Sequence, residues 1–162
     1  MKINKKLVKI ILIFYLFFLN QSTAIENKIL FKVNNQIITS IDVLNEINYL
    51  SLINSDFQKL DKQKIYEVSK NSLIREKIKE INLKKQFVEL KLNEEYLNEL
   101  IKDYSRRVGF KNTNDFNIEL KKNNIKIDSV IKKITIEAFW NQLIIDKFLK
   151  NVKINEDGTK KE

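Results

Sequence analysis

The chain has 162 residues and a formal net charge of +9, from 30 lysines and arginines against 21 aspartates and glutamates, so it is basic and allows one domain or two small ones. It contains no cysteine, histidine or proline and only two glycines. These absences exclude disulfides, thiolate metal sites, cysteine or histidine catalysis and glycine-rich phosphate loops, and they permit long uninterrupted helices.

The N-terminal segment has the three parts of an export signal. Residues 1–9 carry four lysines and no acid, residues 10–19 are all apolar or aromatic, and small residues stand at Ser22 and Ala24. This pattern predicts a cleaved signal peptide over residues 1–24, with cleavage between Ala24 and Ile25. The alternative is an uncleaved anchor, but the apolar run is shorter than the roughly 20 residues that span a membrane. We therefore expect no stable membrane span, and a net charge of +5 once four of the nine charges are removed with the signal.

A β-hairpin and a capped helix are predicted next. Apolar residues alternate over 29–33 and resume over 36–38, and the intervening Asn34-Asn35 tolerates the positive φ angles of a two-residue turn. Thr39 and Asp42 form a capping-box pattern, so a helix is expected from there to about residue 53. Its expected inward face consists of Ile41, Leu44, Ile47 and Leu50.

A long helix is predicted to follow, capped by Asp61 and ending at about Gln86. Its carboxylates Glu76 and Glu80 alternate with basic residues, which is typical of a solvated face rather than of a shielded acid/base pair. Lysine pairs such as Lys132-Lys133 are interpreted in the same way, as solvated helix edges. The sequence therefore predicts no catalytic, cofactor-binding or metal-ligating residues.

The third predicted helix begins after Asn93 and carries an apolar stripe on one side. Glu94 and Glu95 occupy its first turn, and Gly109 follows it as a left-handed cap residue. The stripe consists of Leu97, Leu100, Ile101, Tyr104 and Val108. Arg106 and Arg107 fall in the last turn, where they are interpreted as complementing the helix dipole rather than as an anion site.

Two more helices complete the predicted fold. Thr113 or Asn114 is expected to cap a short one that ends at Asn123-Asn124, and Asp128 leads into an extensively apolar one that reaches about residue 149. The last helix is either the centre of the core or partly an exposed contact face. Residues 152–154 predict a short closing strand that pairs with the hairpin, and residues 155–162 a disordered polar tail. The fold class is therefore mainly α, with an N-terminal β-hairpin and about five helices.

These elements carry a family resemblance. The segment Phe-Lys-Val-Asn-Asn-Gln-Ile-Ile-Thr at 31–39, followed by Ser-Ile-Asp-Val at 40–43, resembles the opening of the N-terminal domain of SurA-type periplasmic chaperones and related parvulin-class foldases. The similarity extends over about residues 28–154 in the order and spacing of caps and apolar stripes. It implies a SurA-N-like helical domain at 25–154, located in the periplasm of a Gram-negative-type envelope.

The resemblance also implies a function. SurA-type proteins hold unfolded or nascent envelope proteins, including outer-membrane proteins, without ATP. The family's parvulin isomerase domain would not fit after Ile154, and its site commonly uses histidines, so we expect a holdase that is not an enzyme. The alternative is an envelope adaptor with one fixed partner, such as a separately encoded foldase; a homodimer also stays open, and no nucleic-acid partner is expected.

Four aromatic residues are the candidate client contacts. Phe57 and Phe110 lie in expected loops and are the better candidates for exposure, whereas Phe139 and Trp140 lie on the last predicted helix. Core packing is the interpretation that the sequence favours for these aromatic residues, and client contact is the alternative.

Overall fold

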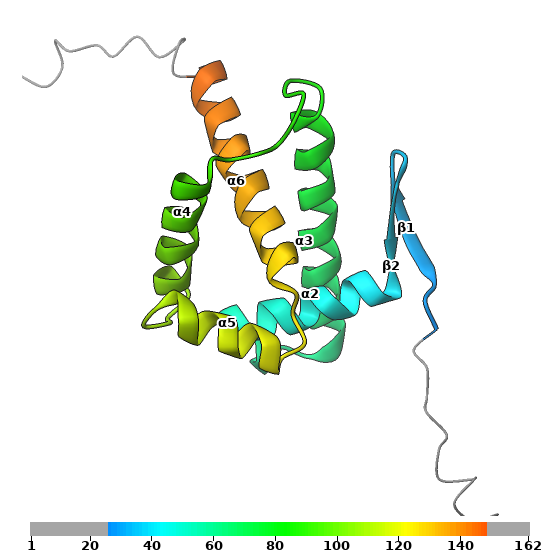
Figure 1. The fold of residues 1–162 in the computed structure, drawn as a ribbon. Coiled ribbons are helices and arrows are strands. Elements are labelled where there is room, and N and C mark those ends of the chain that lie inside the picture. The colour runs from blue at the N-terminus through cyan, green and yellow to red at the C-terminus, as the bar shows by residue number, and fades with distance from the viewer. Residues whose placement is uncertain (1–25, 149–162) are drawn as a thin grey trace, which may run out of the picture.

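The computed structural model describes residues 26–148, and it confirms the mainly helical fold with an N-terminal hairpin (Figure 1). The elements are β1 (Ile29–Val33), β2 (Gln36–Thr39), α2 (Ser40–Ile53), the 3₁₀ turn η1 (Phe57–Lys59), α3 (Lys62–Leu83), α4 (Glu94–Arg107), α5 (Thr113–Lys122) and α6 (Ile127–Phe148). The predicted signal peptide, its cleavage site at Ala24 and Ile25, the closing strand and the polar tail lie outside the described residues. Between residues 26 and 148, no helix combines the length and the apolar character needed to cross a membrane.

The hairpin and the start of α2 form as local sequence dictates. β1 pairs antiparallel with β2, Val33 stands opposite Gln36, and Asn34 takes a positive φ of 51° in the turn. Thr39 is the N-cap of α2: its hydroxyl accepts from the backbone N–H of Asp42, and the Asp42 carboxylate accepts from the Thr39 backbone N–H at 2.7 Å. The predicted capping box is confirmed, and it fixes the direction in which the chain leaves the hairpin.

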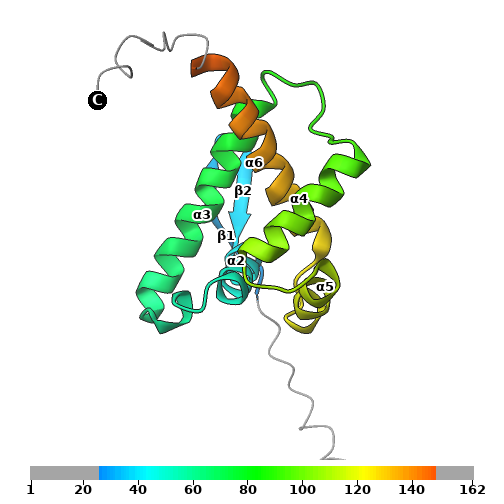
Figure 2. The same ribbon diagram turned by 90° about the vertical axis from the view of Figure 1, so that its left-hand side faces the viewer.

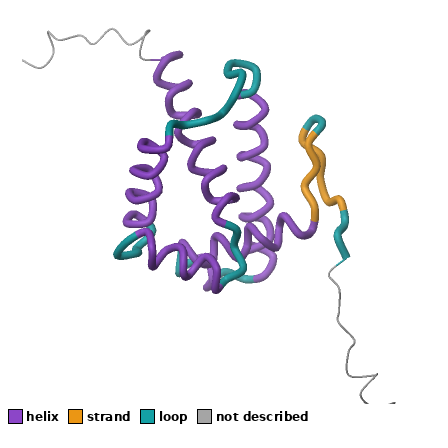
Figure 3. Tube along the Cα trace, viewed as in Figure 1, coloured by secondary structure: helices purple, strands orange, loops and turns teal. Residues whose placement is uncertain are grey.

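The helices are arranged around α6. In Figures 1 and 2, α3 and α6 run side by side in the same direction, α4 returns antiparallel to them, and α2 and α5 lie across the end where α3 and α6 begin. The connection of residues 84–93 crosses from α3 to α4 at the opposite end of the domain (Figure 3). The hairpin lies at the edge and contacts α2 and α3.

The core has three parts. The largest joins α2, α4, α5 and α6 through Tyr49, Ile101, Phe116, Leu120, Ile125, Val130 and Ile134. A second attaches the hairpin to α2 and α3 through Ile38, Val43 and Leu73. The third holds α3 against the middle and the C-terminal part of α6 through Leu83, Ile136 and Leu143, with Phe87 and Leu90 of the connection packed on it. Helix α6 contributes to the first and third clusters and therefore connects the two ends of the domain.

Most predicted helix ends are confirmed and two are wrong. Asp61 and Asn93 cap their helices as predicted, and Gly109 and Asn124 adopt positive φ angles of 94° and 56°. Helix α3 ends at Leu83, short of Gln86. The cap of α5 is Asn112 instead of Thr113 or Asn114, because Asn112 is the last residue with extended backbone angles, and its side chain accepts from the Asp115 N–H at 2.9 Å.

The inward face of α2 also differs from the prediction. Ile41 and Leu44 are each 37% exposed, whereas the helix buries Val43, Glu46 and Tyr49. The apolar stripe therefore indicated the wrong side for the first turns of α2. The physical reason is that the buried side includes the carboxylate of Glu46. Burying a carboxylate costs free energy unless side chains from other helices pair with it.

Candidate functional site

Phe57, one of the predicted contact residues, is a core residue. Only 4% of it is exposed, because the chain forms the turn η1 instead of an open loop and this turn contacts α2. The Phe57 N–H donates to the Asn54 carbonyl at 3.1 Å, which fixes the turn directly after α2. Phe57 is therefore not available as a contact residue, and core packing, the other interpretation, is the one that the structure shows; burial of a ring of this size is favourable.

The other three predicted contacts are half-buried and lie in two places, because Phe110 packs on one core cluster and the adjacent Phe139 and Trp140 pack on another. Phe110 packs on Phe116, with ring centroids 5.1 Å apart, at the corner between α4 and α5. Phe139 meets Phe87 edge to face at 4.9 Å, and the Lys79 ammonium lies 5.8 Å from the ring centroid of Trp140. The structure therefore does not combine these residues into one site, and each lies at the edge of a core cluster.

A groove of about 380 Å³ lies between α4 and α6 and was not predicted. Its apolar and aromatic lining comes from Tyr49, Tyr96, Leu100, Tyr104, Ile134, Ala138 and Ile145, and its polar lining from Arg107, Lys133, Glu137, Asn141 and Gln142. Tyr96 and Ile145 are 46% and 47% exposed, so apolar surface is available to a ligand in the groove. The stripe on α4 was predicted from the sequence, but its pairing with α6 across a groove depends on the packing of helices far apart in the chain.

Two tyrosines of the groove lining are joined through their hydroxyls. The hydroxyls of Tyr49, on α2, and Tyr104, on α4, are hydrogen-bonded to each other, and the Tyr104 ring packs edge to face on Phe116. Burial, followed by the charge and hydrogen bond of Tyr104, raises the pKa of Tyr49. Burial also raises the pKa of Tyr104 against the opposing effects of the Tyr49 hydrogen bond and nearby cations. Both phenols are therefore neutral at neutral pH.

Behind the groove lies a buried charge network that the sequence analysis placed in solvent. The Lys133 ammonium lies 2.7 Å from Glu46 and 2.5 Å from Glu76, and the Ser72 hydroxyl donates to Glu46 at 2.7 Å. Burial lowers the pKa of Lys133, but the charges and hydrogen bonds of Glu46 and Glu76 outweigh it and raise the pKa. The prediction that Glu76 and Lys133 are solvated is therefore wrong, since three helices enclose them.

Glu80 is buried in a second charge cluster. Its side chain is 7% exposed and lies 2.7 Å from the ammonium of Lys84 and 2.8 Å from that of Lys132. Burial alone would raise the pKa of Glu80, but the hydrogen bonds and charges of Lys132 and Lys84 outweigh it and lower the pKa. The prediction that Glu80 is solvated is wrong. Its partner Lys132 belongs to α6, so the sequence of α3 alone does not reveal the contact.

These charge clusters join helices to one another, and their carboxylates are already paired with ammonium groups. Glu46 and Glu76 share one ammonium, and Glu80 has two. Across residues 26–148, no group of three or more histidine, cysteine, aspartate or glutamate side chains could hold a metal ion. The groove between α4 and α6 is therefore the better candidate site. Its lining is suited to binding an extended, partly apolar peptide segment.

Comparison with protein-family models, curated proteins and solved structures gives no match for this chain.

Proposed function

We propose that this chain is an exported, ATP-independent holdase that binds unfolded segments of secreted or outer-membrane proteins in the groove between α4 and α6. The observation that carries the proposal is the half-exposed aromatic and aliphatic lining of that groove, framed by polar side chains. The export pattern of residues 1–24 and the resemblance to SurA-type chaperones support a periplasmic location. On this proposal the chain has no isomerase activity.

The size of the groove suits weak, reversible capture. Shielding about 300 Å² of apolar surface at about 25 cal/mol per Å² contributes roughly 7 kcal/mol before costs. Loss of translational freedom and ordering of an unfolded segment remove much of this. A holdase requires this balance, because it must release its client without an energy source.

The C-terminal end of α6 extends the apolar surface beyond the groove. Val130, Ile134 and Ile136 are covered by the chain's own helices, whereas Ile144, Ile145 and Phe148 are 37%, 47% and 58% exposed. The last turns of α6 therefore offer apolar contacts next to the groove. This open end favours client capture over an adaptor whose apolar face is fully covered.

The test is suppression of aggregation. The purified protein, at near-stoichiometric ratio, should reduce light scattering by several unrelated unfolded outer-membrane proteins. Replacing two exposed lining residues, Tyr96→Ser with Ile145→Ser, should remove most of this protection. The matched control is Ile78→Ser with Ile118→Ser, which removes apolar residues of similar exposure, 45% and 53%, from outside the groove.

Two other results would replace the proposal. No protection of any client, together with one tight partner recovered by crosslinking, would identify the protein as an envelope adaptor. Equal loss of protection in the groove variant and its control would show that the groove is not the binding site. Cell fractionation tests the location, since we expect a periplasmic form that lacks residues 1–24.

A further inference from the structure

Arg107 is the unneutralised charge of the groove. Of the three charged residues that line it, Glu137 is bound by the Lys79 ammonium at 2.5 and 2.7 Å, and Lys133 is held by Glu46 and Glu76. Arg107 has no carboxylate partner within residues 26–148, and its guanidinium lies 5.8 Å from the ring centroid of Tyr104. The groove therefore has an excess positive charge at the Arg107 end.

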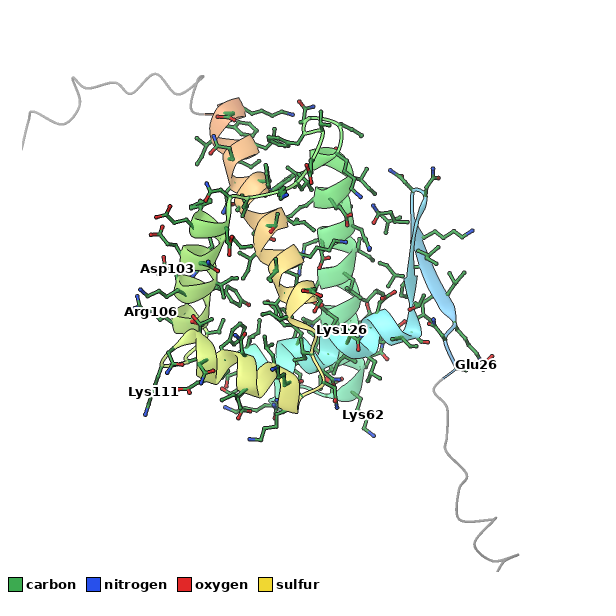
Figure 4. All side chains as sticks on the ribbon, in the orientation of Figure 1. Glu26, Lys62, Asp103, Arg106, Lys111 and Lys126 are labelled. Carbon is green, nitrogen blue, oxygen red and sulfur yellow. The ribbon has the colours of Figure 1, made fainter. Side chains whose placement is uncertain are left out.

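Unlike Arg107, the neighbouring Arg106 is not among the residues that line the groove. Arg106 approaches Asp103 at 3.9 Å, and Figure 4 shows both side chains on the side of α4 that faces away from α6. Both arginines complement the C-terminal end of the helix dipole. Arg107 additionally lines the groove, and complementing the dipole does not occupy its planar set of donors.

The tyrosine pair supplies a second donor. Tyr49 and Tyr104 have one O–H proton each, and the hydrogen bond between them uses only one of the two. Neither hydroxyl has another hydrogen-bond partner in the part of the chain that the structure describes. One O–H therefore has no acceptor among the described residues, and both tyrosines line the same groove as Arg107.

A guanidinium and a phenol O–H together are a donor set for a carboxylate. We propose that the groove selects extended segments that carry a carboxylate, with Arg107 and the Tyr49–Tyr104 pair binding the carboxylate and Leu100 and Ile145 contacting the apolar side chains beside it. The inference rests on the proposed function and names the substrate class of that same groove. The carboxylate is that of an acidic side chain within the extended segment; a chain's carboxyl terminus offers the same acceptor and is the alternative outcome of the test.

Three synthetic peptides distinguish the two sources. The first is Ser-Leu-Gly-Phe-Glu-Leu-Gly-Ser with both ends blocked, the second has Gln in place of Glu, and the third has the same Gln and a free carboxyl terminus. Binding is measured by calorimetry with the purified protein. The Glu peptide should bind about tenfold more tightly than the blocked Gln peptide, as a charge-assisted hydrogen bond predicts. A preference for the third peptide alone would overturn the assignment to acidic side chains and identify chain termini instead.

Variants assign the preference to Arg107. Arg107→Gln should abolish the preference, because it removes the guanidinium that binds the carboxylate. Arg106→Gln, on the outer side of the same helix turn, should keep the full preference. Circular dichroism checks that both variants remain folded.

The failures of the two proposals are distinguishable. Equal affinity for all three peptides, or a preference that survives Arg107→Gln, would overturn carboxylate selection and leave groove binding intact. If no peptide binds at any concentration tested, and none competes with an unfolded client, groove binding itself is overturned together with carboxylate selection.

Discussion

The ammonium of Lys133 on α6 lies 2.7 Å from a carboxylate oxygen of Glu46 on α2, and the two side chains are only 18% and 2% exposed. Replacing Lys133 with Met would leave Glu46 and Glu76 buried without a cation. Breaking a buried pair from one side costs about 3–5 kcal/mol, so we expect Lys133→Met to lower the free energy of unfolding by that amount. Urea denaturation measures it.

The matched control is Lys122→Met. Lys122 pairs with Glu119 at 2.9 Å on the surface of α5, where the two side chains are 70% and 34% exposed, and exposed pairs contribute roughly 0–1 kcal/mol. Adding Glu46→Gln to Lys133→Met should restore part of the loss, because one uncompensated charge is removed. Equal effects of Lys133→Met and Lys122→Met would contradict a stabilising role for the network.

Glu80 predicts a loss of stability in acid. Its pKa is lower in the folded protein than its ordinary value of 4.5, because Lys132 and Lys84 outweigh burial. Its stabilising contribution is therefore present above pH 4.5 and is lost as the pH falls through the folded pKa. Urea titrations at a series of pH values should show a shallower acid decline for Glu80→Gln than for the unchanged protein. Glu94→Gln, in the exposed first turn of α4, serves as the control and should follow the unchanged protein.

The hydroxyl pair and Lys133 predict a loss of stability in alkali. Tyr49, Tyr104 and Lys133 all have a raised pKa in the folded protein, so each holds its proton more tightly there than in the unfolded chain. Their contributions are complete below the ordinary values of 10.0 and 10.5 and are lost as the pH rises above them. Tyrosinate absorbance of Tyr49 should therefore appear together with the loss of helical circular dichroism.

The same pair gives a prediction at neutral pH. Tyr104→Phe leaves the buried Tyr49 hydroxyl without its partner and should cost about 1–3 kcal/mol. Replacing both residues with Phe removes donor and acceptor together, so the double variant should be more stable than Tyr104→Phe alone. A double variant less stable than either single variant would show that the hydroxyls interact with groups other than each other.

Phe57 in the core and Phe148 at the surface are expected to contribute very differently to stability. Phe57 is 4% exposed and Phe148 is 58% exposed. Phe57→Ala should lower the free energy of unfolding by about 3–5 kcal/mol through loss of burial and formation of a cavity. Phe148→Ala should change it by less than about 0.5 kcal/mol. Thermal unfolding of the two variants measures the contrast; similar losses would mean that Phe148 is covered in solution.

Local chemistry made most of the fold predictable. The turn at Asn34, the caps at Thr39, Asp61 and Asn93, and the left-handed Gly109 each depend on residues within a few positions along the chain, and all are confirmed. The cap at Asn112 was not predicted, because Asn112, Thr113 and Asn114 can each cap a helix and only the backbone angles distinguish them.

The buried charges and the groove depend on contacts between distant segments. The sequence around Lys133 resembles any solvated helix edge, because the carboxylates that enclose it belong to α2 and α3. The same contacts hid the true inward face of α2, where Glu46 interrupts the apolar pattern. Phe57 was misplaced because polar neighbours suggested a loop, whereas a single short turn buries its ring.

Because the chain is synthesised from the N-terminus, the position of Lys133 affects the order in which the domain assembles. Lys133 follows Glu76 by 57 positions, so the two carboxylates emerge long before the cation that neutralises them. Until α6 is made, burying them would leave their charges uncompensated, and the clusters that α6 completes stay open to water. Contacts of this separation also slow folding. The charge network and these two clusters can therefore be completed only after α6 has been made, whereas the cluster that joins the hairpin to α2 and α3 needs no residue of α6.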